Sequence, residues 1–98
     1  APFTFSYLMT NVQELAGVSW ELWPNPTRGL TRLRLTGNLP GEMAISLLGL
    51  NGQQLQQWQF PARAGTYDLD VSELPAGVYL LRLRNGPAQA TTRLVRLR

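Results

Sequence analysis

The sequence predicts an all-β domain, a seven-stranded β-sandwich of the immunoglobulin or fibronectin III type. Strand-like runs recur at roughly ten-residue intervals and are separated by Gly, Pro, Asn and Asp, which is typical of sandwich domains. Several runs also alternate apolar with polar residues, as a strand with one buried face must. Beyond Gly17 no apolar stripe of helical period competes with this pattern.

The first 17 residues differ in pattern from the rest of the 98-residue chain. We expect residues 1–17 to be a linker or the end of a preceding domain, and residues 18–98 to form the sandwich domain. Residues 3–7 alternate as a short strand would, and residues 8–16 favour one or two helical turns that stop at Gly17.

Seven strands are expected in the domain, with their apolar residues facing one core. In residues 32–36 two leucines alternate with two arginines, which predicts leucines inside and arginines in water. In residues 79–84, Tyr79, Leu81 and Leu83 share the core face and the arginines point outward. The expected strands are 18–23, 30–36, 43–50, 53–60, 66–71, 78–84 and 91–97.

Two short phrases predict the first turns. Pro24-Asn25-Pro26 fixes φ at both prolines and removes two N–H donors, so the preceding strand must end at a rigid corner. Asn51-Gly52 stands between two strand-like runs and predicts a hairpin with a type I′ turn, because both residues tolerate positive φ.

The next phrase predicts a side-chain-closed turn followed by a corner. The side chains of Asp70 and Ser72 can accept hydrogen bonds from backbone N–H groups downstream. Tyr79 can bury its ring and return its hydroxyl to nearby backbone, as in the tyrosine corner of sandwich domains. We expect Gly77 to take a conformation that a Cβ would forbid.

The composition excludes most catalytic, redox and metal-binding chemistry. The chain has no Cys, hence no disulfide or thiolate, and no His, the commonest general base and metal ligand. No apolar run approaches the ~18 residues that a membrane span needs. The net charge of +3 rests on nine arginines without any lysine and attracts polyanions only weakly. We therefore expect no nucleic-acid partner.

Two acidic and three aromatic residues are the remaining candidates for a site. Asp68 and Asp70 lie on one strand face, where a solvated surface is favoured over an acid/base pair or a calcium site. Trp20, Trp23 and Trp58 could form a sugar-binding platform, but Trp20 and Trp23 fall on opposite strand faces, so packing is favoured. We expect no catalytic residue, no metal and no cofactor.

Several phrases, in this order, resemble a known family. They are Trp23-Pro24-Asn25-Pro26, Leu50-Asn51-Gly52-Gln53, Leu69-Asp70-Val71-Ser72-Glu73-Leu74, Gly77-Val78-Tyr79 and the basic, apolar ending Thr92-Arg93-Leu94-Val95-Arg96-Leu97-Arg98. From about Trp20 to Arg98 the chain resembles the type A C-terminal sorting domain of the type IX secretion system (Por secretion system) of Bacteroidetes-like bacteria.

The resemblance implies a sorting signal without catalysis of its own. Such a domain directs a larger cargo protein, encoded upstream in the same chain, across the outer membrane. The implied partners are the outer-membrane translocon and a sortase-like peptidase. The implied route runs through the periplasm to the cell surface or the medium, with the export signal upstream of residue 1.

The resemblance also places recognition on the last strand, at Arg93, Val95, Arg96 and Arg98. Family members frequently carry Lys at the terminal basic positions, where this chain has Arg. A terminal edge strand exposes N–H and C=O groups that a receptor could pair by strand addition, and weak self-association through an edge strand is also expected. The alternative is a fibronectin-III-like or carbohydrate-binding accessory domain of a secreted enzyme.

Overall fold

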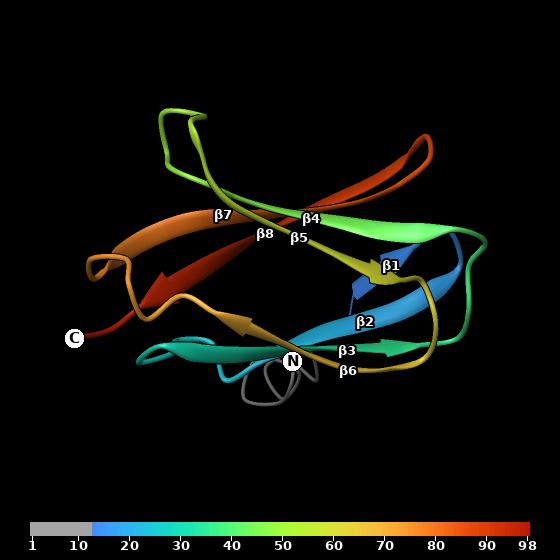
Figure 1. Cartoon of the computed structure of the whole chain (residues 1–98), viewed down its shortest axis with the longest axis horizontal. Helices are drawn as coiled ribbons and strands as arrows, with labels where there is room; N and C mark the ends of the chain where they lie inside the picture. Colours follow the sequence, from blue (N-terminus) through green and yellow to red (C-terminus); the bar gives the residue numbers. More distant parts are fainter. Residues whose placement is uncertain (1–12) are drawn as a thin grey trace, which may run out of the picture.

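The computed structural model describes residues 13–98 as two four-stranded antiparallel sheets packed face to face (Figure 1). One sheet has the order β1-β2-β3-β6 and the other the order β5-β4-β7-β8. None of the described segments is a helix that could cross a membrane. The strands are β1 (Gln13–Leu15), β2 (Val18–Trp23), β3 (Leu30–Thr36), β4 (Glu42–Leu48), β5 (Gln54–Pro61), β6 (Gly65–Asp70), β7 (Gly77–Asn85) and β8 (Ala88–Arg96).

All seven expected strands are present, which confirms the predicted β-sandwich, and β1 is an additional strand. The helical turns expected over residues 8–16 are wrong where the structure describes them, because β1 pairs antiparallel with β2. Ala16 and Gly17 connect the two strands with φ of 51° and 89°, as a tight two-residue hairpin requires. The strand expected at residues 3–7 lies outside the described residues.

The hairpin between β4 and β5 forms, but its turn is not of type I′. The amide of Gly52 donates to the carbonyl of Gly49 at 2.9 Å, and only Gly52 takes positive φ, at 89°. Asn51 instead accepts a hydrogen bond from the Gln53 amide at its side-chain Oδ1, at 3.0 Å. The five-residue connection allows an ordinary turn followed by one left-handed glycine, so Asn51 need not adopt the left-handed conformation.

The core lies between the two sheets and follows the predicted alternation. In β3, Leu33 and Leu35 are buried while the intervening arginines are exposed. In β7, Tyr79, Leu81 and Leu83 are buried, Arg84 is exposed and Arg82 is half-buried. The burial of these residues confirms the core faces predicted for β3 and β7, because a period of two places successive side chains on opposite faces.

Candidate functional site

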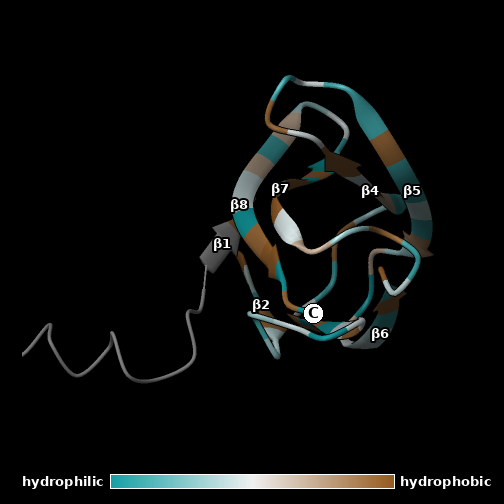
Figure 2. Cartoon of the chain, turned by 90° about the vertical axis from the view of Figure 1, so that its left-hand side faces the viewer, coloured by the Kyte–Doolittle hydropathy of each residue, from teal (hydrophilic) through white to brown (hydrophobic). Residues whose placement is uncertain are grey.

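The turn phrases gather at one end of the sandwich, which we call the terminal end: residues 24–29, 49–53, 71–76 and 93–98. At this end β2 leads into β3, β4 into β5 and β6 into β7, and β8 finishes beside the start of β7. Figure 1 shows these connections on the left, and Figure 2 views the molecule from that side, with the C-terminus in front. Segments far apart in the sequence therefore form one surface.

The open edge of β8 is capped at this end by one side chain. The side-chain amide of Asn25 donates to the carbonyl of Arg93 at 2.8 Å, and its Oδ1 accepts from the amide of Val95 at 3.0 Å. One asparagine thus supplies both the donor and the acceptor that a neighbouring strand would offer. Trp23-Pro24 and Asn25-Pro26 are both cis peptide bonds.

The backbone of Thr27 continues the cap toward the end of the chain. Its amide donates to the carbonyl of Val95 at 2.9 Å, and its carbonyl accepts from the amide of Leu97 at 2.7 Å. Thr27 is itself only 2% exposed, and its hydroxyl accepts from the amide of Gly29 at 3.1 Å. The result is a short parallel bridge between Thr27 and Arg96.

These four hydrogen bonds correct the expectation that the last strand offers free backbone groups. The outward-facing groups of Arg93, Val95 and Leu97 named above already have partners within the domain. A receptor strand could pair with this stretch only after removing residues 25–27. The sequence signal was present in Pro24-Asn25-Pro26, but nothing in it indicated which distant strand the asparagine would reach.

The four predicted recognition residues do not share one environment. Leu94 is fully buried, so its neighbours Arg93 and Val95 point away from the core, on the outer face of the β5-β4-β7-β8 sheet. Arg93 is exposed and Val95 is half-buried. The carbonyl of Arg98 accepts a hydrogen bond from the guanidinium of Arg28 at 2.7 Å, which holds the last residue against the 24–29 loop.

Arg96 turns toward the β6–β7 connection instead. Its guanidinium donates to the carbonyls of Ser72 at 2.9 Å and Val71 at 3.3 Å, and also to the carbonyl of Leu97. The bonds to Val71 and Ser72 are charge-assisted and reach carbonyl groups that follow β6, so Arg96 ties the end of β8 to the other sheet. Arg96 thus has a structural contact set that Arg93 does not share.

Asp70 stands beside this arginine. Its carboxylate accepts a hydrogen bond from the amide of Ser72 at 2.9 Å, which closes the turn that follows β6. Hydrogen bonds from the side chain and the backbone of Ser72, with a smaller contribution from the charge of Arg96, hold the pKa of Asp70 below its ordinary value of 3.8. The carboxylate therefore stays charged over the whole neutral range.

The corner that enters β7 is held by Tyr79, whose hydroxyl donates to the carbonyl of Pro75 at 2.5 Å. The prediction for Gly77 is wrong. Its φ lies outside the left-handed range, and a Cβ there would meet the ring of Tyr79 at an ordinary 3.9 Å. Gly77 starts the extended strand β7, and its backbone conformation there is one that residues with a side chain also adopt.

A shallow apolar hollow lies over the same end. The 24–29 loop, the start of β3 and Leu97 surround it, with Asp70 and Ser72 at one side. Leu30 and Leu97 contribute exposed apolar surface, at 42% and 39% exposure. The terminal end therefore combines arginines with accessible apolar side chains, a combination found in surfaces that bind proteins.

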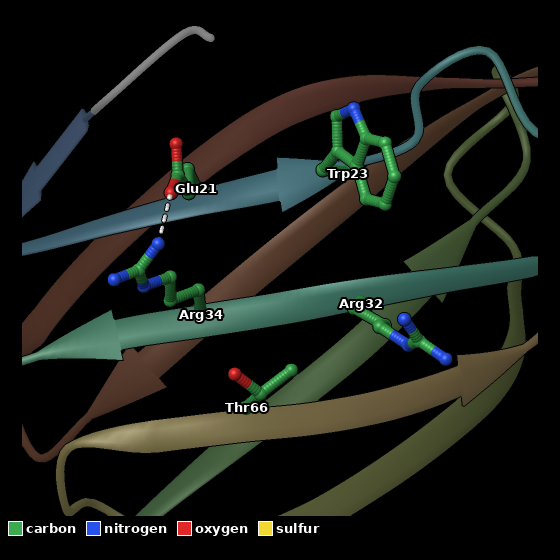
Figure 3. A pocket seen from close by; sticks show the side chains of 5 residues that line it. All are labelled: Glu21, Trp23, Arg32, Arg34 and Thr66. Carbon is green, nitrogen blue, oxygen red and sulfur yellow. Dashed lines mark ion pairs between the residues drawn. The ribbon is translucent and has the colours of Figure 1, made fainter.

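The tryptophans do not form a row. Trp20 is 1% exposed in the core, Trp58 is half-buried against it, and Trp23 is 62% exposed on the outer face of the other sheet. Figure 3 shows Trp23 standing beside a second depression, with Arg34 paired to Glu21 at 3.7 Å. Among the described residues, one exposed tryptophan does not provide the planar aromatic row that the sugar-binding alternative requires.

The two aspartates of β6 each have a separate partner. Asp68 pairs with Arg32 at 3.2 Å across neighbouring strands, and Asp70 is held by Ser72. Within residues 13–98, no three acidic side chains come together in a group that could hold a metal ion. This arrangement favours the solvated strand face over an acid/base pair.

Residues 21–96 match the family model described as the secretion system C-terminal sorting domain. The match covers the 24–29 loop, the β4–β5 hairpin, the Asp70 turn, the Tyr79 corner and all of β8. No curated protein matches the chain.

Proposed function

Because this chain belongs to the family of secretion-system C-terminal sorting domains and is a sorting signal for type IX secretion, we propose that the secretion machinery reads a preformed surface at the terminal end. A domain of this kind interacts with that machinery and directs export to the cell surface or the extracellular space.

The recognised residues are Arg93 and Val95 on β8, whose edge is already occupied at this end, and Arg98 two residues beyond the strand. The cap formed by Asn25 and Thr27 supports this proposal, because four hydrogen bonds fix residues 93–97 before any partner arrives. A fixed segment loses little conformational entropy on binding, so preorganisation raises affinity. Guanidinium groups further accelerate encounter with an acidic partner surface.

Arg96, the fourth residue expected from the sequence, acts in this proposal as a positioning residue. Its guanidinium already donates hydrogen bonds to the carbonyls of Val71 and Ser72, and these bonds orient the last residues of β8. The outer-membrane translocon would contact the terminal end, and a sortase-like peptidase would act on the upstream side of the domain. The cargo attached upstream would pass through the periplasm before it reaches the cell surface or the medium. The domain itself would have no catalytic role.

A secretion assay tests the recognition surface. The 98-residue chain is fused behind a signal-bearing fluorescent passenger in a host with a type IX system. Arg93→Gln combined with Arg98→Gln is expected to lower export by about fivefold or more, since charge pairs at an interface contribute this much or more to binding. The matched control is Arg63→Gln with Arg84→Gln, which removes the same charge from exposed positions away from the terminal end.

Two results would contradict the proposal. Equal export of the two double variants would show that net charge, and not the terminal end, governs recognition. Export of the Arg93 and Arg98 variant at the level of the unchanged fusion would show that neither guanidinium is read. Periplasmic levels and protease resistance of each fusion establish that the variants fold.

A further inference from the structure

The β5-β4-β7-β8 sheet has a second edge, formed by β5, and we infer that it pairs with β5 of a second copy of this chain. The proposed dimer is antiparallel and two-fold symmetric, and it joins two four-stranded sheets into one of eight strands. This inference is independent of the sorting function. It rests on the composition, the exposure and the neighbours of β5.

Among the described strands, β5 has a single partner, β4. Figure 2 places β5 and β8 at opposite margins of their sheet. An edge strand leaves alternate N–H and C=O groups unpaired along its outer side. The other three edges are poor templates: β1 has three residues, β6 carries Asp68 and Asp70, and β8 is capped at its end by residues 25–27.

The sequence of β5, Gln-Leu-Gln-Gln-Trp-Gln-Phe-Pro, contains no charged residue and four glutamines. Charged side chains are the usual protection of an edge against pairing, and two copies of a charged edge repel each other. A neutral edge has no such repulsion toward itself. Glutamine amides are both donors and acceptors, so glutamines facing each other across a two-fold axis can hydrogen-bond reciprocally.

The register of such a pairing is bounded at both ends. Gln54 and Gln56 pair with consecutive residues of β4, which leaves Leu55 as an extra residue in a bulge, and Pro61 cannot donate a backbone hydrogen bond. The regular stretch between these limits centres on Trp58. A two-fold axis there sets Gln57 of one copy opposite Gln59 of the other.

Apolar surface beside the edge favours the same contact. Trp58 and Phe60 lie on the core-facing side of β5 and are only half-buried, with the Phe60 ring centroid 4.7 Å from that of Tyr67. Pairing at the axis would bring the two Trp58 rings together and remove part of their surface from water. One strand pair buries less than a standard interface, so the expected dimer is weak, with a dissociation constant on the order of 10⁻⁴ M.

Charge placed on the edge tests the inference. Gln57→Lys with Gln59→Lys sets like charges opposite each other and is expected to weaken dimerisation by about fivefold or more. The matched control is Gln89→Lys with Thr91→Lys, which adds the same charge at exposed positions on β8, at the other edge of the same sheet. The measurement is sedimentation equilibrium of the 98-residue chain from about 10 µM to about 1 mM, a range that brackets the expected constant.

A charge-swap experiment sharpens the test. Gln57→Glu with Gln59→Glu should weaken self-association as the lysine variant does, and mixing the two variants should restore dimers to within about twofold of the unchanged chain. Circular dichroism verifies that each variant is folded. A chain that stays monomeric up to about 1 mM, an equal loss in the β8 control, or a mixture that fails to dimerise would each overturn the inference.

Discussion

The two edge strands of the β5-β4-β7-β8 sheet have similar lengths but differ in charge and in what covers them. β8 carries arginines and is capped at its end by Asn25 and Thr27, whereas β5 is neutral and has only β4 beside it among the described strands. The difference indicates that a single loop can block strand pairing along the last residues of an edge strand, here residues 93–97. It also separates the two proposed roles, recognition through side chains held on β8 and self-pairing through the backbone of β5.

The largest expected difference between the edges is in their anchorage to the core. Leu94 of β8 is 0% exposed and Leu55 of β5 is 37% exposed. Leu94→Ala is expected to lower the free energy of unfolding by about 2–5 kcal/mol, because it leaves a cavity in the core. Leu55→Ala should cost less than about 1 kcal/mol. Urea unfolding measures both values, and similar losses would show that the two edges are anchored alike.

The next effect concerns the cap itself. Asn25→Ala removes two hydrogen bonds from β8 and should lower the free energy of unfolding by about 1–3 kcal/mol. Asn51→Ala, the matched control, removes one local hydrogen bond and should cost about 0.5–1 kcal/mol. Asn25→Asp should fall between the unchanged chain and the alanine variant, because it keeps the acceptor for the Val95 amide and loses the donor. A smaller loss for Asn25→Ala than for Asn51→Ala would contradict the proposed importance of the cap.

The smallest effect is the pH response at the end of β8. The pKa of Asp70 is lower in the folded chain than its ordinary 3.8, so its contribution to stability is present above that pH. This contribution disappears as the pH falls through the folded-state pKa. Ser72→Ala should raise the pKa of Asp70 by removing the largest cause of the shift, and Arg96→Gln should raise it less. NMR titration of the carboxyl group measures both changes, and a pKa at or above 3.8 in the unchanged chain would contradict this account.

The turns show which features neighbouring residues determine and which depend on strand pairing. Asn51-Gly52 indicated the hairpin between β4 and β5, but the left-handed pair of residues occurs at Ala16-Gly17. The difference follows from the number of residues between the paired strands, since two-residue loops favour type I′ or II′ turns and five-residue loops are most often built around an ordinary type I turn. Register across the sheet decides that number, and register depends on how both strands pack on the core.

Local patterns in the sequence predicted the core faces of β3 and β7, the positions of seven of the eight strands in residues 13–98, and the family that the phrases resemble. Period-two alternation and turn residues are local, so they can be read along the chain, as at residues 32–36. Tertiary packing alone brings Asn25 to Arg93 and Val95, nearly 70 residues away, and turns Arg96 toward Val71 and Ser72. Those contacts depend on strand order and sheet packing, which bring the ends of distant strands to one surface, and no local pattern encodes that arrangement.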